Sequence, residues 1–173
     1  MRKSIHFIKE QTCAFTGYRP ESFIFNNNEE HRACLLIKES LAGQIDIMAA
    51  NGVDTFITGM ARGVDMWAAE AVLRLKETRY AHLRLIAAVP YAGQDDRWSM
   101  ADQFRYDGLL YRCTGIITLS SVYYRGCLLA RNRFMVDNAH HLIAVYNGSD
   151  KGGTAYTVNY ARRCERHIVI IDA

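Results

Sequence analysis

The chain reads Thr58-Gly59-Met60-Ala61-Arg62-Gly63-Val64-Asp65 where a short apolar strand gives way to an amphipathic helix. Two glycines bracket the turn, and their missing side chains let a ligand come close to the backbone. Free N–H groups and the dipole at a helix start favour an anion there. Arg62 is a cation placed at the positive end of this helix, which suggests a phosphate or carboxylate partner. The alternative is a solvated arginine, with Asp65 as an ordinary first-turn acid.

The same strand–helix alternation extends over the whole sequence. We expect strands at residues 12–16, 54–58, 83–89, 115–119, 141–146 and 167–171. Helical periodicity marks the segments between them, at about residues 33–48, 64–75, 98–112, 128–139 and 154–166. The strands at 85–89 and 168–171 are apolar throughout, which is typical of strands buried on both faces. The sequence therefore predicts an α/β fold, with a mostly parallel sheet between two layers of helices.

Composition narrows the class of protein. The 173 residues fit one domain, spanning residues 1–173, and half of them are hydrophobic. Twenty-one basic residues minus 18 acidic ones give a net charge of +3, which is small for a surface that holds nucleic acid. No apolar run approaches the about 18 residues that cross a membrane, and the first ten residues lack a secretory pattern. Five scattered cysteines without a Cys-x-x-Cys pair indicate free thiols, so we expect a cytoplasmic protein without membrane contacts.

Glycines, hydroxyl residues and arginines gather in the segments that follow the strands. In a parallel sheet all of these segments lie at one rim, where ligands bind. The last of them, 151–154, reads Lys-Gly-Gly-Thr and repeats the anion-binding pattern, although it could be a glycine turn with Thr154 as the N-cap. Residues 131–133 place cations on an early helical turn or on a charged solvent face. Arg19, after Thr16 and Gly17, could reach a phosphate or pair with a surface acid.

The roles of several aromatic and histidine residues can be interpreted in two ways. Tyr91 and Trp98 could stack on a base or belong to the core and rim. Residues 123–125 (Tyr-Tyr-Arg) could stack on a base or cover the sheet edge. His140 and His141 are adjacent rather than at metal-ligand spacing, so no metal site is expected.

Three motifs resemble a known superfamily. Residues 58–65 resemble the "S-G-x-A-R-G-I-D" signature of the DNA-processing DprA/Smf family, 131–133 its "R-N-R", and 16–19 its first glycine loop. This family belongs to the Rossmann-like SLOG superfamily, which also contains the LOG-type nucleotide phosphoribohydrolases.

The similarity is closer still to the YpsA-like branch of this superfamily. Its "T-G-H-R-P" is met at residues 16–20, with Tyr18 in place of histidine, and its "V-P-[FY]-x-x-Q-x-x-x-W" at 89–98. Its "R-N-x-x-M-[VI]-D" is met at 131–137 and its "G-G-T" at 152–154. The match runs from about residue 12 to residue 173.

The resemblance implies a Rossmann-like three-layer α/β/α fold with a pocket for a nucleotide-derived ligand such as ADP-ribose, an NAD-like molecule or a nucleotide. It also implies a homodimer, which nothing in the residues shows independently. No further cofactor is expected. The ligand-binding residues that motifs and resemblance together indicate are Thr16, Gly17, Arg19, Gly59, Ala61, Arg62, Gly63, Asp65, Pro90, Gln94, Arg131, Asn132, Gly152, Gly153 and Thr154.

Three functions compete, in this order. The first is binding or sensing of the nucleotide-derived ligand, and the second is DprA-like binding of single-stranded DNA, which needs a basic track and stacking aromatics. The third is hydrolysis of an N-glycosidic bond in a nucleotide. The LOG-type motif "P-G-G-x-G-T-x-x-E" has a glutamate where this chain has Thr157, which leaves Asp65 as the candidate general acid or base.

Overall fold

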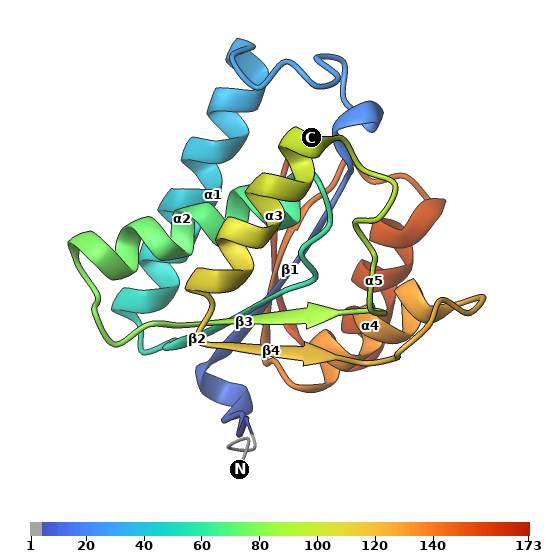
Figure 1. Cartoon of the computed structure of the whole chain (residues 1–173). Coiled ribbons are helices and arrows are strands. Elements are labelled where there is room, and N and C mark those ends of the chain that lie inside the picture. The colour runs from blue at the N-terminus through green and yellow to red at the C-terminus, as the bar shows by residue number, and fades with distance from the viewer. Residues whose placement is uncertain (1–4) are drawn as a thin grey trace.

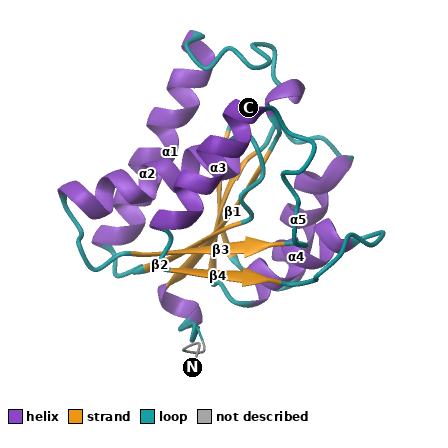
Figure 2. Cartoon of the chain, in the orientation of Figure 1, coloured by secondary structure: helices purple, strands orange, loops and turns teal. Residues whose placement is uncertain are grey.

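The computed structural model describes residues 5–173 and contains one six-stranded sheet with helices on both faces (Figure 2). Its strands are β1 (Thr12–Gly17), β2 (Thr55–Thr58), β3 (Arg84–Val89), β4 (Gly115–Thr118), β5 (His141–Val145) and β6 (His167–Ile171). Its α-helices are α1 (Arg32–Ala50), α2 (Val64–Thr78), α3 (Met100–Arg112), α4 (Cys127–Asp137) and α5 (Gly152–Arg163). Two 3₁₀ turns, η1 (Lys9–Gln11) and η2 (Pro20–Ser22), flank β1.

The strands lie in the order β4-β3-β2-β1-β5-β6, and every neighbouring pair is parallel. The chain moves outward from β1 to β4 and then returns past β1 to β5 and β6. Because crossovers between parallel strands are right-handed, this reversal puts α1, α2 and α3 on one face and α4 and α5 on the other (Figure 1). The predicted three-layer α/β/α fold is confirmed.

The strand residues alternate between two cores. Cys13 and Phe15 of β1 pack into the larger core beneath α1, α2 and α3, where Phe15 stacks on Phe56 with ring centroids 5.9 Å apart. Ala14, between them, faces the smaller core beneath α4 and α5 together with Ile57. Burial of both faces explains why the central strands are apolar throughout.

Two of the three helices on the first face begin with a side-chain cap, whereas α2 follows Gly63 and has none. On the first face His31 caps α1 by accepting from the N–H of Ala33 (3.2 Å), and Ser99 caps α3 by accepting from that of Asp102 (3.1 Å). Neither α4 nor α5 has a side-chain cap. Thr154 as N-cap is therefore wrong: α5 begins two residues earlier, at Gly152, and ends at Arg163 rather than at residue 166.

The fold has one topological switch point. β1 and β5 are paired neighbours, but the chain leaves β1 toward β2 on one side and leaves β5 toward β6 on the other. The loops after β1 and β5 therefore separate at the carboxyl edge of the sheet, which is where open α/β sheets bind ligands. Within residues 5–173, no helix is long and apolar enough to span a membrane, and no three His, Cys, Asp or Glu side chains form a metal-binding group.

Candidate functional site

A cavity of about 640 Å³ opens at this switch point, and we call it the switch-point cavity. Its volume lies in the range of small-molecule sites. Its walls come from four segments that are far apart in sequence: the loop after β1, the start of α2, the start of α4 with the loop before it, and the start of α5. The lining residues that the sequence predicted are Thr16, Gly17, Arg19, Ala61, Asp65, Arg131, Asn132, Gly152, Gly153 and Thr154.

The start of α5 forms one end of the cavity. Gly152 has φ +92°, and a Cβ at Gly152 or Gly153 would meet nothing within 4 Å. The backbone N–H groups of residues 152–154 donate to none of residues 5–173. Thr154 is only 6% exposed, yet its hydroxyl has no partner in the described chain. This end therefore presents free donors at the positive end of a helix.

The start of α4 forms the opposite end. Gly126 has φ +93° and precedes Cys127, Leu128 and Leu129, whose apolar side chains line the wall. These residues are not among the candidates that the sequence predicted. Gly126, directly before a helical segment, was the signal that could have revealed them, since glycine tolerates the positive φ that this turn requires.

The floor of the cavity is a buried pair of opposite charges. Arg131 (4% exposed) donates to the carbonyl of Gly59, and Asp65 (7% exposed) accepts from the N–H of Ala61 at 3.2 Å. Burial raises the pKa of Asp65, which Arg131 opposes, and burial lowers the pKa of Arg131, which Asp65 opposes. A Cβ at Gly59 would collide with the guanidinium of Arg131. Because Gly59 has no side chain, the guanidinium of Arg131 can come close to its backbone.

At Gly17 and Gly63 too, other protein atoms occupy the space where a side chain would be. A Cβ at Gly17 would lie 2.6 Å from side-chain atoms of Val64, and one at Gly63 would lie 2.7 Å from the carbonyl oxygen of Tyr18. The N–H of Val64 donates to the same Tyr18 carbonyl at 3.4 Å. These glycines let the loop after β1 pack directly on the start of α2.

Asn132 and Thr157 connect α4 to α5 behind the cavity. Asn132 donates from Nδ2 to Oγ1 of Thr157 (2.8 Å), and its Oδ1 accepts from Nε of Arg131 (2.8 Å). Thr157 in turn donates to the carbonyl of Gly153 at 2.8 Å. The residue at the position of the LOG-type glutamate is therefore a buried link between helices, which holds the cavity wall in place.

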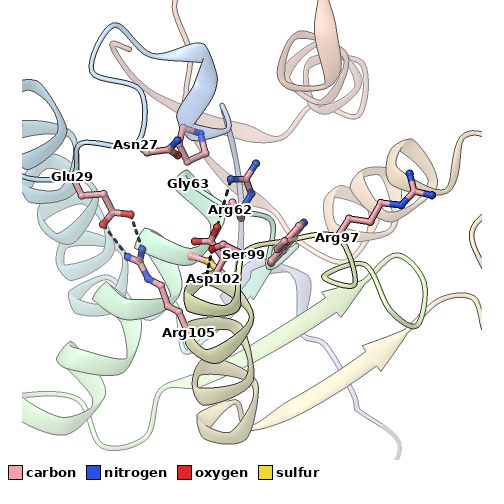
Figure 3. Close-up of a pocket in the computed structure, with 11 residues that line it drawn as sticks. Asn27, Glu29, Arg62, Gly63, Arg97, Ser99, Asp102 and Arg105 are labelled. Carbon is pink, nitrogen blue, oxygen red and sulfur yellow. Dashed lines mark hydrogen bonds and ion pairs between the residues drawn. The ribbon is translucent and has the colours of Figure 1, made fainter.

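Arg62 lies outside this cavity, in a neighbouring hollow of about 630 Å³ that we call the α3 cleft (Figure 3). Arg62 pairs there with Glu21 and, at 3.6 Å, with Asp102. The α3 cleft lies between η2, the start of α2 and the start of α3, and Gly63 lines it as well. The structure does not bring Arg62 and Gly63 together with the start of α5.

Three more candidates support the loops without lining either hollow. Gly59 lies beneath Arg131, and Pro90 is buried. Gln94 (8% exposed) donates from Nε2 to the carbonyls of Gly59 (3.4 Å) and Met60 (3.3 Å). Gln94 thus braces the turn before α2. Trp98 lines the α3 cleft and packs edge-to-face on Tyr106, with ring centroids 5.3 Å apart.

Two cations that line the switch-point cavity have no ion-pair partner in the described chain. Arg19 and Lys151 line it, and neither side chain forms an ion pair or hydrogen bond within residues 5–173. Thr16 (5% exposed) also lines it with a hydroxyl that has no partner in the described chain. The cavity thus collects unpartnered donors and positive charge, which suit an anion.

Solved structures with this architecture include two DNA processing proteins. DNA processing protein A (DprA) from Streptococcus pneumoniae superposes with a TM-score of 0.61 at 18% identity, over 96% of this chain and 51% of that one. DprA from Helicobacter pylori, solved for its single-stranded DNA binding mode, gives a TM-score of 0.59 at 18% identity, over 92% of this chain and 64% of that one. This chain therefore spans about half to two thirds of their length and has their fold.

Sequence comparison gives the family. A UPF0398 protein of Shouchella clausii is 31% identical over 150 residues, which are 85% of this chain and 79% of the relative. A UPF0398 protein of Halalkalibacterium halodurans is 28% identical over 156 residues, 88% of this chain and 81% of the relative. The family model of YpsA, described as the YspA SLOG family, matches residues 13–172. Since that match covers nearly the whole sequence, the chain belongs to the YpsA family of SLOG proteins.

Proposed function

We propose that this protein binds a small anionic, nucleotide-derived ligand in the switch-point cavity, with the anion at the start of α5. The observation that carries the proposal is the set of free donors there: three backbone N–H groups, at residues 152–154, without a partner in the described chain. The first N–H groups of a helix have no partner within the helix, and they are satisfied by a capping side chain, by water or by a ligand. An anionic oxygen would satisfy these donors and interact favourably with the helix dipole.

The surrounding charges support an anion rather than a neutral molecule. Arg19 and Lys151 add two open positive charges to the same cavity. Beneath them, the buried side chains of Asp65 and Arg131 each lie near the opposite charge of the other. A phosphate or pyrophosphate is the nucleotide part that these groups would hold. In this proposal residues 1–173 act as one ligand-binding domain.

The cavity favours binding over hydrolysis. Among its lining residues Asp65 is the one carboxylate, and it is held by the Ala61 N–H opposite Arg131. Thr157 stands at the position of the LOG-type glutamate and is committed to hydrogen bonds with α4 and α5. Among the lining residues Asp65 therefore has no second carboxylate with which to divide proton transfer, as paired-carboxylate hydrolases do.

Calorimetry with AMP, ADP-ribose, NAD and a single-stranded oligonucleotide tests the proposal. We expect at least one of the three small ligands to bind with micromolar affinity. Gly153→Asp puts a carboxylate among the free N–H groups, where a Cβ meets nothing, so it should weaken binding about 100-fold without loss of fold. Gly43→Asp, on the exposed face of α1 with equally open space, is the matched control.

Two outcomes would overturn the proposal. One is the absence of binding to all three small ligands, with salt-sensitive binding of the oligonucleotide instead. The other is binding that Gly153→Asp and Gly43→Asp weaken equally, since the anion would then lie away from α5.

A further inference from the structure

We infer that the ligand carries an aromatic base and that this base stacks on Tyr123, at the α4 end of the cavity. The inference rests on the proposed function of that cavity and adds the chemical class and orientation of the ligand. Tyr123 lines the cavity, yet 63% of its surface is exposed. A large aromatic side chain left open at the mouth of a polar site offers a stacking surface.

Tyr91 supports the ring of Tyr123 from one side. The two ring centroids lie 5.3 Å apart and the ring planes are 79° apart, which is an edge-to-face pair. Whichever of the two presents its edge, at least one face of the Tyr123 ring is left free. Tyr91 does not line the cavity itself, so it acts as a support.

The loops that carry these two rings are fixed to each other. The N–H of Ala92 donates to the carbonyl of Ser120 at 3.0 Å, which joins the loop after β3 to the loop after β4. The hydroxyl of Ser120 donates to the carbonyl of Val122 (2.7 Å) and accepts from its N–H (3.2 Å). A ring held in this way loses little conformational freedom when a base stacks on it.

The two ends of the cavity differ in polarity, and this sets the direction of the ligand. Cys127, Leu128 and Leu129 make the α4 end apolar, whereas residues 151–154 make the α5 end polar and positive. α4 and α5 pack side by side, and the starts of both helices line the one cavity. In this arrangement a nucleoside 5′-phosphate binds with its phosphate at α5 and its base at α4.

Binding of AMP and of ribose 5-phosphate, measured by calorimetry, separates the two ends. AMP should bind the unaltered protein at least tenfold more tightly than ribose 5-phosphate, because only AMP stacks. Tyr123→Ala should remove that difference by weakening AMP about tenfold while ribose 5-phosphate is unchanged. Tyr123→Phe keeps the ring and should bind AMP normally. Tyr111→Ala, which removes a 91% exposed tyrosine from α3, is the control.

The inference and the proposed function fail in different ways. If Tyr123→Ala weakens both ligands equally, or neither, the base is not on Tyr123, while binding that Gly153→Asp abolishes would still support the anion site. If neither ligand binds the unaltered protein, the anion site itself is wrong and the inference falls with it.

Discussion

The switch-point cavity and the α3 cleft have nearly the same volume, about 640 and 630 Å³, and both contain arginines. They differ in how their polar groups are satisfied. In the α3 cleft Arg105 pairs with Glu29 and with Glu70 at 2.6 Å each, and Arg62 pairs with Glu21 and Asp102. The switch-point cavity instead contains hydroxyls, N–H groups and cations without a partner in residues 5–173. Arg97 also lines the α3 cleft without an ion pair or hydrogen bond in residues 5–173, so the two hollows differ in how many of their polar groups lack a partner.

The ion pairs of the α3 cleft connect three helices. Arg105 of α3 reaches Glu70 of α2 and Glu29, which also pairs with Lys38 of α1. Burial alone would raise the pKa of Glu29, but hydrogen bonds from Arg105 and Lys38 outweigh it and lower that pKa to about 2. The ion pairs of the α3 cleft thus hold the helix layer together on one face of the sheet.

The largest expected effect is on folding, from Arg131→Met. It leaves the buried Asp65 without its opposite charge, so we expect the free energy of unfolding to fall by about 3–5 kcal/mol. Arg62→Met breaks only part-exposed pairs in the α3 cleft and should cost about 0–1 kcal/mol. Urea denaturation of both variants measures the contrast. Equal losses would mean that the two regions do not differ in burial of charge.

A double variant sharpens this prediction. Adding Asp65→Asn to Arg131→Met removes the unpaired carboxylate, so the double variant should be more stable than the sum of the two single losses implies. Strict additivity would show that the two buried groups do not interact across Gly59.

The contributions of Glu29 and Asp65 to stability should change in opposite directions as the pH falls. Because the folded-state pKa of Glu29 is lowered to about 2, its contribution is full above pH 4.5 and is lost as the pH falls toward 2. Glu29→Gln should therefore reduce the loss of unfolding free energy between pH 4.5 and pH 2 by on the order of 2 kcal/mol. The raised pKa of Asp65 has the opposite sign, so Asp65→Asn should make the loss of stability in acid steeper. Urea midpoints between pH 2 and 6 test both, and matching slopes would contradict the contrast.

A smaller effect concerns two arginines on neighbouring loops. Arg19 is open in the switch-point cavity, so Arg19→Ala should weaken AMP binding about tenfold and reduce its dependence on salt. Arg62 is already paired in the α3 cleft, so Arg62→Ala should leave AMP binding unchanged. Calorimetry at 50 and 300 mM salt compares them. A larger loss from Arg62→Ala would place the anion in the α3 cleft.

The sequence predicted the fold well because continuous apolar strands and helical periodicity are local signals. It indicated the region in which α5 starts for the same reason, although the helix begins at Gly152 rather than at residue 154. It could not tell Gly153, which faces open space, from Gly59, which admits Arg131 from 72 residues away. Nor could it show that Arg62 turns toward Glu21 and Asp102, because those contacts depend on how η2 and α3 pack. Long-range partners decide which polar residues remain free.

The smallest effect compares two threonines one turn apart on α5. Thr154 lines the cavity and its hydroxyl has no partner in the described chain, so Thr154→Val should keep stability and weaken AMP binding about threefold. The hydroxyl of Thr157 accepts from Asn132 of α4 and donates to the carbonyl of Gly153. Thr157→Val would therefore leave the side-chain amide of Asn132 without its acceptor and remove this link between α4 and α5. That variant should lose about 1 kcal/mol of unfolding free energy. If both substitutions lower stability alike and leave AMP binding intact, the hydroxyl of Thr154 does not contact the ligand. The absence of a hydrogen-bond partner would then not identify the residues that bind the ligand.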